Sequence, residues 1–382
     1  MGSNDMARVL MVTHSPAPDY RIDKEAEALK AAGHEIFLIY PKLRREMSTI
    51  YKDSFCIPLN LRQRALEPIA SRIAAKKFKK IINSIKPDVI HAHDITAANI
   101  VRFVIPNSIK FVYDDHEIWE YLRKRQVVAT KNIMKKLIVR VIQFLTKKIN
   151  KKITHKADMI IVINDHWIDY YQKKGINSGK IITIENFTSK SLSKYVLESK
   201  VTIDDFFIKD RRKKIIHSSK LKLSAKVVRD VSNFAKAAQE LDDWVMVVFS
   251  SIDEEFEKLG VKFIDPKPRM EYLASVSKCD VALNALLLDE RFHYSSSNRL
   301  YEFIALGLRV IASPAQTYVE KFGDDLIWAG TETPKEEIKE ILRNIDNYTT
   351  GKDLQKFIEK YNWENEMAKL VKKYEELLKI RY

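Results

Sequence analysis

Residues 296–313 read Ser-Ser-Asn-Arg-Leu-Tyr-Glu-Phe-Ile-Ala-Leu-Gly-Leu-Arg-Val-Ile-Ala-Ser, and this stretch is the most informative in the sequence. A polar loop leads into a short predicted helix that carries Glu302; Gly307 ends the helix and an apolar strand follows. Such a joint suits a phosphorylated ligand, because a helix N-terminus offers N–H groups and positive dipole charge. An ordinary helix–strand joint of an α/β protein has the same spacing, so the rest of the chain must decide.

Predicted strands and helices alternate along the whole chain, which indicates parallel sheets with helices on both faces. The predicted strands are residues 8–13, 35–40, 88–93, 110–113, 158–163, 181–185, 214–217, 244–250, 261–264 and 280–284. The pattern restarts after a polar stretch at 186–210, which we expect to be a linker. We therefore predict an α/β protein with two Rossmann-like domains that face each other across a ligand-binding cleft.

The 382 residues suit two domains of ordinary size, and a hydrophobic content of 46% is enough for two cores. We place the N-terminal domain at 6–190 and the C-terminal domain at 200–361, with a final helix over 362–382 returning to the first domain. No apolar run reaches the ~18–20 residues that a bilayer span needs. Cys56 and Cys279 have no metal-ligand spacing, and a reducing cytoplasm fits them.

The positive charge of the chain is concentrated in one region. The net charge is +15, and between Glu120 and Asp158 there are twelve Lys or Arg residues and no acidic residue. A long helix predicted at 131–156 combines these charges with an apolar stripe. The stripe could pack on the N-terminal sheet with the lysines in water, or the helix could dock on an anionic membrane surface, which we favour.

Several segments, in order along nearly the whole chain, resemble family 4 glycosyltransferases. They are residues 19–39, 87–94, 112–117, 157–163, 184–187, 296–313 and 361–364. The resemblance implies a GT-B fold, a UDP- or GDP-linked sugar donor, and transfer that retains configuration. It implies no metal ion and no cofactor besides the donor substrate.

The same resemblance implies a donor site in the C-terminal domain. Arg299 and Lys220 would bind the diphosphate, with Lys226 nearby. Glu302 would accept hydrogen bonds from ribose hydroxyls, and Asn298 and Leu300 belong to the same donor-binding motif. Tyr294 stands where the family has a first glutamate, and Glu290 lies near enough in sequence to replace it.

On the N-terminal domain the resemblance implies that His116 is catalytic, together with Glu302, Arg299 and Lys220 of the donor domain. We expect His116 to donate a hydrogen bond as a neutral imidazole beside the sugar and acceptor. The further acceptor-side candidates are Arg21, His93, Asp94, Asp115 and Glu117. His93 is preferred over His91, because we expect the two to point to opposite faces of their strand.

These features predict a glycosyltransferase that acts on an envelope glycan or a polyprenyl-linked acceptor, at the cytoplasmic face of the inner membrane. A soluble GT-B transferase acting on a small metabolite is an alternative. A non-enzymatic protein that binds nucleic acid or membrane through the basic region is another, although no nucleic-acid-binding motif accompanies the lysines. The missing glutamate also leaves open an inactive partner subunit.

Overall fold

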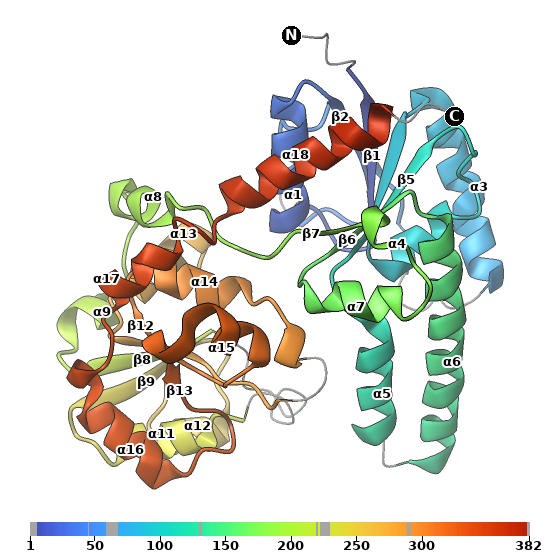
Figure 1. Cartoon of the computed structure of the whole chain (residues 1–382). Helices are drawn as coiled ribbons and strands as arrows, with labels where there is room; N and C mark the ends of the chain where they lie inside the picture. The colour runs from blue at the N-terminus through green and yellow to red at the C-terminus, as the bar shows by residue number, and fades with distance from the viewer. Residues whose placement is uncertain are drawn as a thin grey trace. The chain divides into compact units, whose positions relative to one another are not determined.

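The computed structural model describes residues 6–44, 46–58, 68–129, 132–218, 221, 230–288 and 292–379. The chain divides into two compact units, the first formed by Met1–Glu185 with Glu366–Tyr382 and the second by Asn186–Asn365 (Figure 1). Each unit contains one parallel sheet flanked by helices, as expected for two Rossmann-like domains of the GT-B type.

The sheet of the first unit has the order β3-β2-β1-β4-β5-β6-β7. Its strands are β1 (Arg8–Thr13), β2 (Glu35–Tyr40), β3 (Asp53–Cys56), β4 (Val89–His93), β5 (Lys110–Asp115), β6 (Met159–Val162) and β7 (Ile181–Thr183). Its helices are α1 (Tyr20–Ala31), α3 (Pro68–Ile85), α4 (Asp94–Val101), α5 (Trp119–Ala129), α6 (Ile133–Lys156) and α7 (His166–Gln172). The central strands are apolar and buried on both faces, which explains why they read as continuous hydrophobic runs.

The sheet of the second unit has the order β10-β9-β8-β11-β12-β13. Its strands are β8 (Lys213–His217), β9 (Trp244–Phe249), β10 (Lys262–Ile264), β11 (Val281–Asn284), β12 (Arg309–Ala312) and β13 (Ile327–Trp328). Its helices are α8 (Leu192–Glu198), α9 (Asp205–Lys209), α11 (Ser232–Gln239), α12 (Glu254–Glu257), α13 (Arg269–Val276), α14 (Asn298–Ala305), α15 (Gln316–Phe322), α16 (Lys335–Arg343) and α17 (Gly351–Leu354). The order reverses between β8 and β11, so the carboxyl ends of these strands flank a switch point of the kind where α/β sheets bind ligands.

The stretch 186–210 is not the irregular linker that its polarity suggested. It contains α8 and α9, and Phe187, Leu192, Val196 and Phe207 are buried in a core cluster of the second unit. Four apolar side chains at suitable spacing are enough to hold a polar segment against a core.

The last helix, α18 (Trp363–Lys379), confirms the expected return of the chain to the first unit. Its Tyr374 side chain is fully buried, and the hydroxyl is hydrogen-bonded to Nδ1 of His91 on β4 at 2.8 Å. The carboxylate of Glu366 accepts a hydrogen bond from the backbone N–H of Glu185 at 2.8 Å. These two contacts tie the end of the chain to the sheet.

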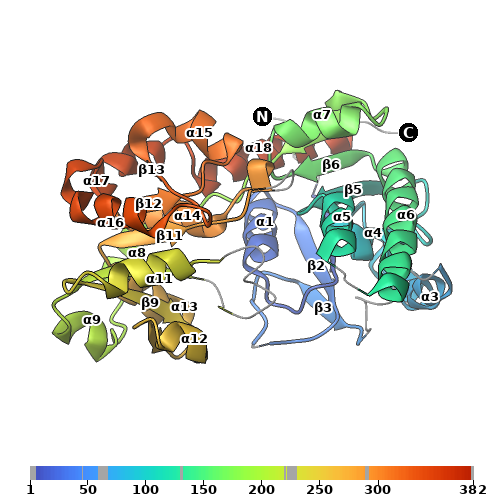
Figure 2. The same cartoon turned by 90° about the horizontal axis from the view of Figure 1, so that it is seen from below.

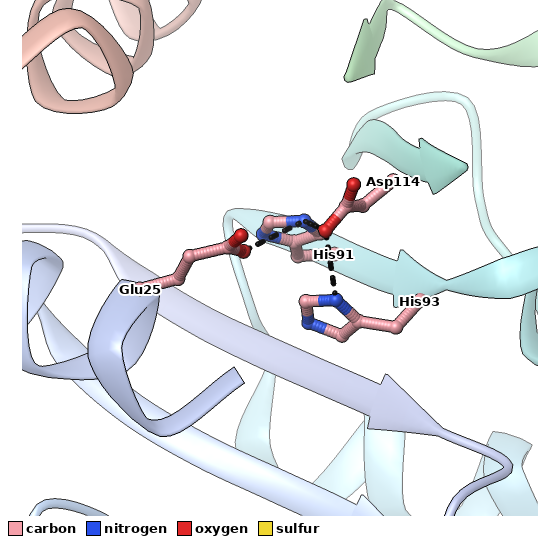
Figure 3. A group of neighbouring side chains, drawn as sticks. All are labelled: Glu25, His91, His93 and Asp114. Atoms are coloured by element: carbon pink, nitrogen blue, oxygen red, sulfur yellow. Dashed lines mark hydrogen bonds and ion pairs between the residues drawn. The ribbon is translucent and has the colours of Figure 1, made fainter. Parts of the chain in front are cut away.

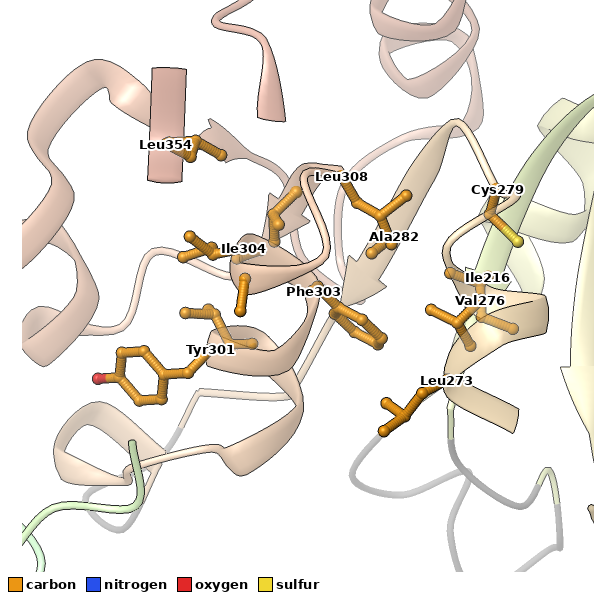
Figure 4. Close-up of a cluster of buried hydrophobic side chains, with 14 of the residues drawn as sticks. Ile216, Leu273, Val276, Cys279, Ala282, Tyr301, Phe303, Ile304, Leu308 and Leu354 are labelled. Carbon is orange, nitrogen blue, oxygen red and sulfur yellow. The ribbon is translucent and has the colours of Figure 1, made fainter. Parts of the chain in front are cut away.

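Helix α14 ends in a Schellman motif, as Gly307 predicted. Gly307 has a φ of +79°, and its N–H donates to the carbonyl of Ile304 while the N–H of Leu308 donates to that of Phe303. Phe303, Ile304 and Leu308 are buried in the core cluster shown in Figure 4. The turn thereby sends the chain directly from α14 into β12.

Gly351, at the start of α17, lies against this turn. A Cβ atom built on Gly351 would be 1.9 Å from the carbonyl oxygen of Gly307, which is backbone and cannot move aside. We predict that Gly351→Ala lowers the free energy of unfolding by more than ~2 kcal/mol, as overpacking against fixed groups does. Urea denaturation followed by circular dichroism measures this loss.

Gly323→Ala is the matched control. Gly323 differs from Gly351 in having a positive φ, of +51°, but nothing lies within 4 Å of its added Cβ. The Gly323→Ala substitution should lower the free energy of unfolding by only ~1 kcal/mol, the cost of placing an L residue in this backbone conformation. Equal losses in the two variants would contradict the steric account.

Candidate functional site

The polar residues that follow β4 and β5 meet because these strands are neighbours in the first sheet. His93 on β4 pairs in register with Asp114 on β5. Asp94 follows the first strand and His116 follows the second. His91 and His93 lie on the same face, with their rings stacked at 4.3 Å between centroids. The expectation of opposite faces is therefore wrong, because side chains two residues apart in a strand point the same way.

Asp114 is the centre of this group. Its carboxylate is fully buried and accepts hydrogen bonds from Nε2 of His116 at 2.8 Å and Nδ1 of His93 at 3.1 Å. The Arg21 guanidinium, also buried, donates to both oxygens of Asp114 at 3.2 and 3.4 Å. Nε of Arg21 further lies 3.1 Å from Oε1 of Glu25, and NH1 donates to the Ile184 carbonyl. Arg21, which lies in α1, thus contacts Asp114 directly.

The charges of this group depend on one another. Burial works against ionisation of Asp114, but Arg21 and His116 hold the pKa of its carboxyl well below the usual range. Burial would also lower the pKa of His116, yet Asp114 and Asp94 raise that pKa to about 10. His116 is therefore an imidazolium at neutral pH rather than the neutral imidazole expected from the sequence. It keeps 22% of its side chain exposed, so it can still reach a ligand.

Three more members of the group have pKa values shifted in the opposite direction to those of Asp114 and His116. Burial, together with the charge of Asp114, raises the pKa of Glu25 to about 8. Burial lowers the pKa of His93, and it lowers the pKa of His91 well below the usual value. Strongly shifted groups of this kind gather at functional sites, although structural ion-pair networks show them too.

Asp94 starts helix α4 in a strained conformation, with a φ of +66°. Its Oδ1 accepts hydrogen bonds from the backbone N–H of His116 at 3.3 Å and from Nε1 of Trp119 at 3.4 Å. Its Oδ2 lies 3.7 Å from Nδ1 of His116 and 3.8 Å from Nδ1 of His14. A non-glycine residue in this region costs ~1–3 kcal/mol, and such strain is typical of functional sites.

The remaining two acceptor-side candidates have different surroundings. Asp115 is buried, and its carboxylate accepts hydrogen bonds from the hydroxyls of Tyr113 and Tyr171. Its side chain is therefore bound inside the unit. Burial raises the pKa of Asp115 to about 8 in spite of these bonds. Glu117 is partly buried in the bend between β5 and α5.

In the second unit, α14 presents its N-terminus after the loop that ends at Ser297. Ser297 is the N-cap residue, but its side chain makes no capping hydrogen bond; its hydroxyl lies 3.3 Å from Oδ1 of Asn284 instead. Asn298 is exposed and Arg299 partly exposed on the first turn. The Leu300 side chain is fully buried in the core, so only its backbone N–H is suited to contact a ligand.

Glu302, one turn further along α14, is 5% exposed and ion-paired. Its Oε1 accepts a hydrogen bond from Arg269, the first residue of α13, at 2.6 Å. Arg269 was missed by the sequence analysis, because nothing in its local sequence connects it with a residue 33 positions away. Beside it, the Tyr272 hydroxyl is hydrogen-bonded to that of Ser218, and burial raises the pKa of Tyr272 to about 12.

Three residues named from the sequence, Lys220, Lys226 and Glu290, lie outside the described residues. Tyr294, at the position of the family's first glutamate, donates a hydrogen bond from its hydroxyl to Oε1 of Gln316 at 3.1 Å. The backbone N–H and the side-chain amide of Asn186 donate to Oγ and the carbonyl of Ser296, each at 3.1 Å, and so fix the loop before α14.

Helix α6 does not bury its apolar stripe on the sheet. Figure 2 shows α5 and α6 side by side as a helical hairpin. Six large apolar side chains in the first half of α6 are more than half exposed, namely Ile133 83%, Met134 68%, Leu137 57%, Ile138 57%, Val141 52% and Phe144 57%, whereas Val139 and Ile142 are partly buried. Only residues nearer its C-terminal end, such as Ile149 and Ile153, are buried, so the packing account holds for that end alone. None of the described helices combines the length and apolar character needed to cross a bilayer.

The two parallel sheets define a two-domain protein of the GT-B class. Residues 21–191 match the model of Glycosyltransferase Family 4, which covers most of the first unit. The whole chain thus has the GT-B fold, and its residues 21–191 are similar to family 4 glycosyltransferases. A comparison with curated protein sequences found no match.

Solved structures with this fold cover nearly the whole chain. Sucrose-phosphate synthase from Thermosynechococcus elongatus has a TM-score of 0.69 at 16% identity, covering 97% of this chain and 99% of that chain. WaaG, a glycosyltransferase involved in lipopolysaccharide biosynthesis, has a TM-score of 0.67 at 12% identity, with coverage of 95% and 98%. The UDP-GlcNAc 2-epimerase of Neisseria meningitidis, solved with UDP-GlcNAc, has a TM-score of 0.59 at 14% identity, with coverage of 96% and 98%. At these identities the likeness shows the fold, which transferases share with epimerases.

The pair formed by Arg269 and Glu302 allows a quantitative test. We predict that Arg269→Met and Glu302→Gln each destabilise the protein, since each leaves one partner of a partly buried ion pair alone. The double variant should recover on the order of 1 kcal/mol relative to the sum of the single changes. Arg269 is a third exposed, so solvent screening keeps this coupling modest.

The coupling is measured by a double-mutant cycle on urea denaturation midpoints. Strict additivity of the two single changes would show that the pair contributes nothing to stability.

Proposed function

We propose that this glycosyltransferase moves a sugar from a UDP- or GDP-sugar to an envelope glycan or a lipid-linked acceptor at the cytoplasmic face of the membrane. The observation that carries the donor part is the N-terminal part of α14, where a helix N-terminus without a side-chain cap, Arg299 and, one turn later, Glu302 occur together. The donor class is also supported by the UDP-GlcNAc bound to the epimerase of related fold.

The chemistry of a diphosphate leaving group fits this turn. Negative charge grows on the diphosphate as the glycosidic bond breaks, and it can be stabilised by the Arg299 guanidinium and the first N–H groups of α14. We propose that Lys220 and Lys226 assist there, and that no metal ion is needed at the diphosphate. A carboxylate such as Glu302 accepts hydrogen bonds from two neighbouring ribose hydroxyls, and the hydrogen bond from Arg269 orients it.

The acceptor part of the proposal is based on the strand ends of the first unit. His116 is partly exposed, positively charged and held by Asp114 and Asp94, so it can donate a hydrogen bond to the sugar or the acceptor. Arg21 and His93 act behind it through Asp114, whereas Asp94 also holds the backbone of His116. Retention of configuration is proposed from the family resemblance.

Membrane docking is supported by the exposed half of α6. Its apolar residues are flanked by Lys135, Lys136, Arg140, Lys147 and Lys148, a combination that suits an anionic lipid surface. Each basic residue near such a surface contributes ~1 kcal/mol, and each inserted apolar side chain adds to this. The likeness in fold to WaaG, which acts in lipopolysaccharide biosynthesis, is consistent with an envelope glycan as the product.

Donor binding is tested at Glu302. We predict that Glu302→Gln weakens the affinity for the preferred nucleoside diphosphate by about tenfold or more, because hydrogen bonds to a charged acceptor contribute ~1.5–3 kcal/mol. Isothermal titration calorimetry with UDP and GDP measures the change. Glu332→Gln, at an exposed turn position of the same unit, should bind like the wild type.

Unchanged affinity in Glu302→Gln, with intact folding, would remove Glu302 from the donor site. Absence of binding to every nucleoside diphosphate by the folded wild type would contradict the donor proposal as a whole.

Membrane docking is tested with the double variant Leu137→Ser/Ile138→Ser. Both side chains are exposed, so folding should be unaffected while flotation with phosphatidylglycerol-containing vesicles falls by at least tenfold. Binding should weaken with added salt and be poor on phosphatidylcholine vesicles. The matched control is Leu197→Ser/Ile208→Ser, which removes two exposed apolar side chains from the second unit.

If the wild type fails to float with anionic vesicles, the soluble transferase acting on a small metabolite becomes the better reading. An equal loss in the control variant would show that α6 is not the docking surface.

A further inference from the structure

Four side chains of metal-binding type meet inside the first unit. Glu25 comes from α1, His91 and His93 from β4, and Asp114 from β5 (Figure 3). Each offers one ligand atom, and these atoms all lie within 4.8 Å of one another. All four side chains are fully buried. We call this group the buried quartet.

Hydrogen bonding among the described residues leaves part of the quartet unsatisfied. Nε2 of His91 has no hydrogen-bond partner, and it points toward Oε2 of Glu25 at 3.7 Å and Oδ2 of Asp114 at 3.9 Å. Neither oxygen of Glu25 accepts a hydrogen bond, although Oε1 is ion-paired with Arg21. Buried polar atoms nearly always have a hydrogen-bond partner. Polar atoms that converge without hydrogen bonding to one another therefore indicate that a ligand binds between them.

The spacing of these atoms suits a small cation. The separations of 3.7 Å, 3.9 Å and, between Nδ1 of His93 and Oδ2 of Asp114, 3.1 Å bracket the ~3.3 Å edge of a tetrahedron with metal–ligand bonds of ~2.0–2.1 Å. Two imidazoles and two carboxylates form a donor set that zinc accepts in proteins. All the ligand atoms lie within 4.8 Å of one another, so the longest separations would have to shorten when the ion binds.

The surroundings hold the ligands as the outer shell of a metal site does. The Tyr374 hydroxyl lies 2.8 Å from Nδ1 of His91, so Nδ1–H can donate to it and leave the lone pair of Nε2 directed at the quartet. Arg21 binds Oδ1 of Asp114 at 3.2 Å and Oε1 of Glu25 at 3.1 Å, which orients both carboxylates. Any proton on a coordinating nitrogen or oxygen leaves when the ion binds.

We propose that Glu25, His91, His93 and Asp114 bind one Zn²⁺ ion as a closed structural site. Four protein ligands without solvent access complete a tetrahedral shell and leave no open position for a substrate. The ion would join α1 to β4 and β5 behind His116, and Tyr374 would extend its hold to α18. This site is independent of the donor proposal, because every ligand belongs to the first unit and none to α14.

No local pattern of residues points to such a site. The ligands are spread from position 25 to position 114, and only the two histidines of β4 are close together in the chain. The family resemblance led us to expect no metal ion, and the present proposal departs from that expectation.

The experiment measures zinc directly. The full chain is purified, incubated with excess Zn²⁺, dialysed, and analysed by inductively coupled plasma mass spectrometry. We expect one zinc per chain, a higher melting temperature with Zn²⁺ than after treatment with a strong chelator, and visible absorption of tetrahedral Co²⁺ when Co²⁺ replaces Zn²⁺. Glu25→Gln and His91→Gln should lose the metal and the chelator-sensitive part of the melting temperature.

Matched controls share the chemistry of the substitutions. Glu27→Gln changes an exposed glutamate on the same helix, and His155→Gln an exposed histidine on α6; both should retain one zinc per chain. Only trace zinc in the folded wild type, with no Co²⁺ absorption, would overturn the proposal and leave a proton shared within the quartet as the occupant. Full zinc stoichiometry in a folded Glu25→Gln variant would overturn it as well, and the wild-type measurements stand even if a variant does not fold.

Discussion

The buried ion pair between Arg21 and Asp114 organises the first unit. Arg21 comes from α1 and Asp114 from the end of β5, and both are removed from water, so each needs the other. Once ionised in the interior, Asp114 orders His93 and His116 around its second oxygen. The position and the charge of His116 therefore depend on Arg21, which lies near the start of the domain sequence. The same carboxylate is shared with the buried quartet, which joins the exposed edge of the site to the helix behind it.

The second unit also contains an ion pair, between Arg269 and Glu302, which is less buried than the pair of Arg21 with Asp114. Gly307 turns the chain from α14 into β12, and the buried face of α14 anchors the helix in the core. This leaves the first turn of α14 facing outward with its N–H groups uncapped by Ser297. Arg269 then donates a hydrogen bond to the largely buried Glu302 and orients its side chain. A rigid helix N-terminus, a cation and a hydrogen-bond acceptor are groups that suit the recognition of a nucleoside diphosphate.

The exposed half of α6 contrasts with both sites, because it exposes apolar area instead of burying it. A soluble domain rarely leaves several large apolar side chains uncovered on one helix face beside a row of lysines. The physical cost of that exposure is removed if the face meets a lipid surface. In that case the strand ends proposed to contact the acceptor belong to the same domain as the membrane contact.

The sequence by itself determined the alternation of strands and helices, the two parallel sheets, the Schellman turn at Gly307 and the residues that end β4 and β5. These features depend on local periodicity and backbone conformation, which a short segment already specifies. Only the tertiary structure decided which distant side chains meet. Arg21 pairs with Asp114, which is 93 residues away, Arg269 pairs with Glu302, and Glu25 lies beside the histidines of β4. The tertiary structure also decided that the α6 stripe faces outward and that 186–210 packs on a core, because an amphipathic pattern specifies a face of a helix but not what covers that face.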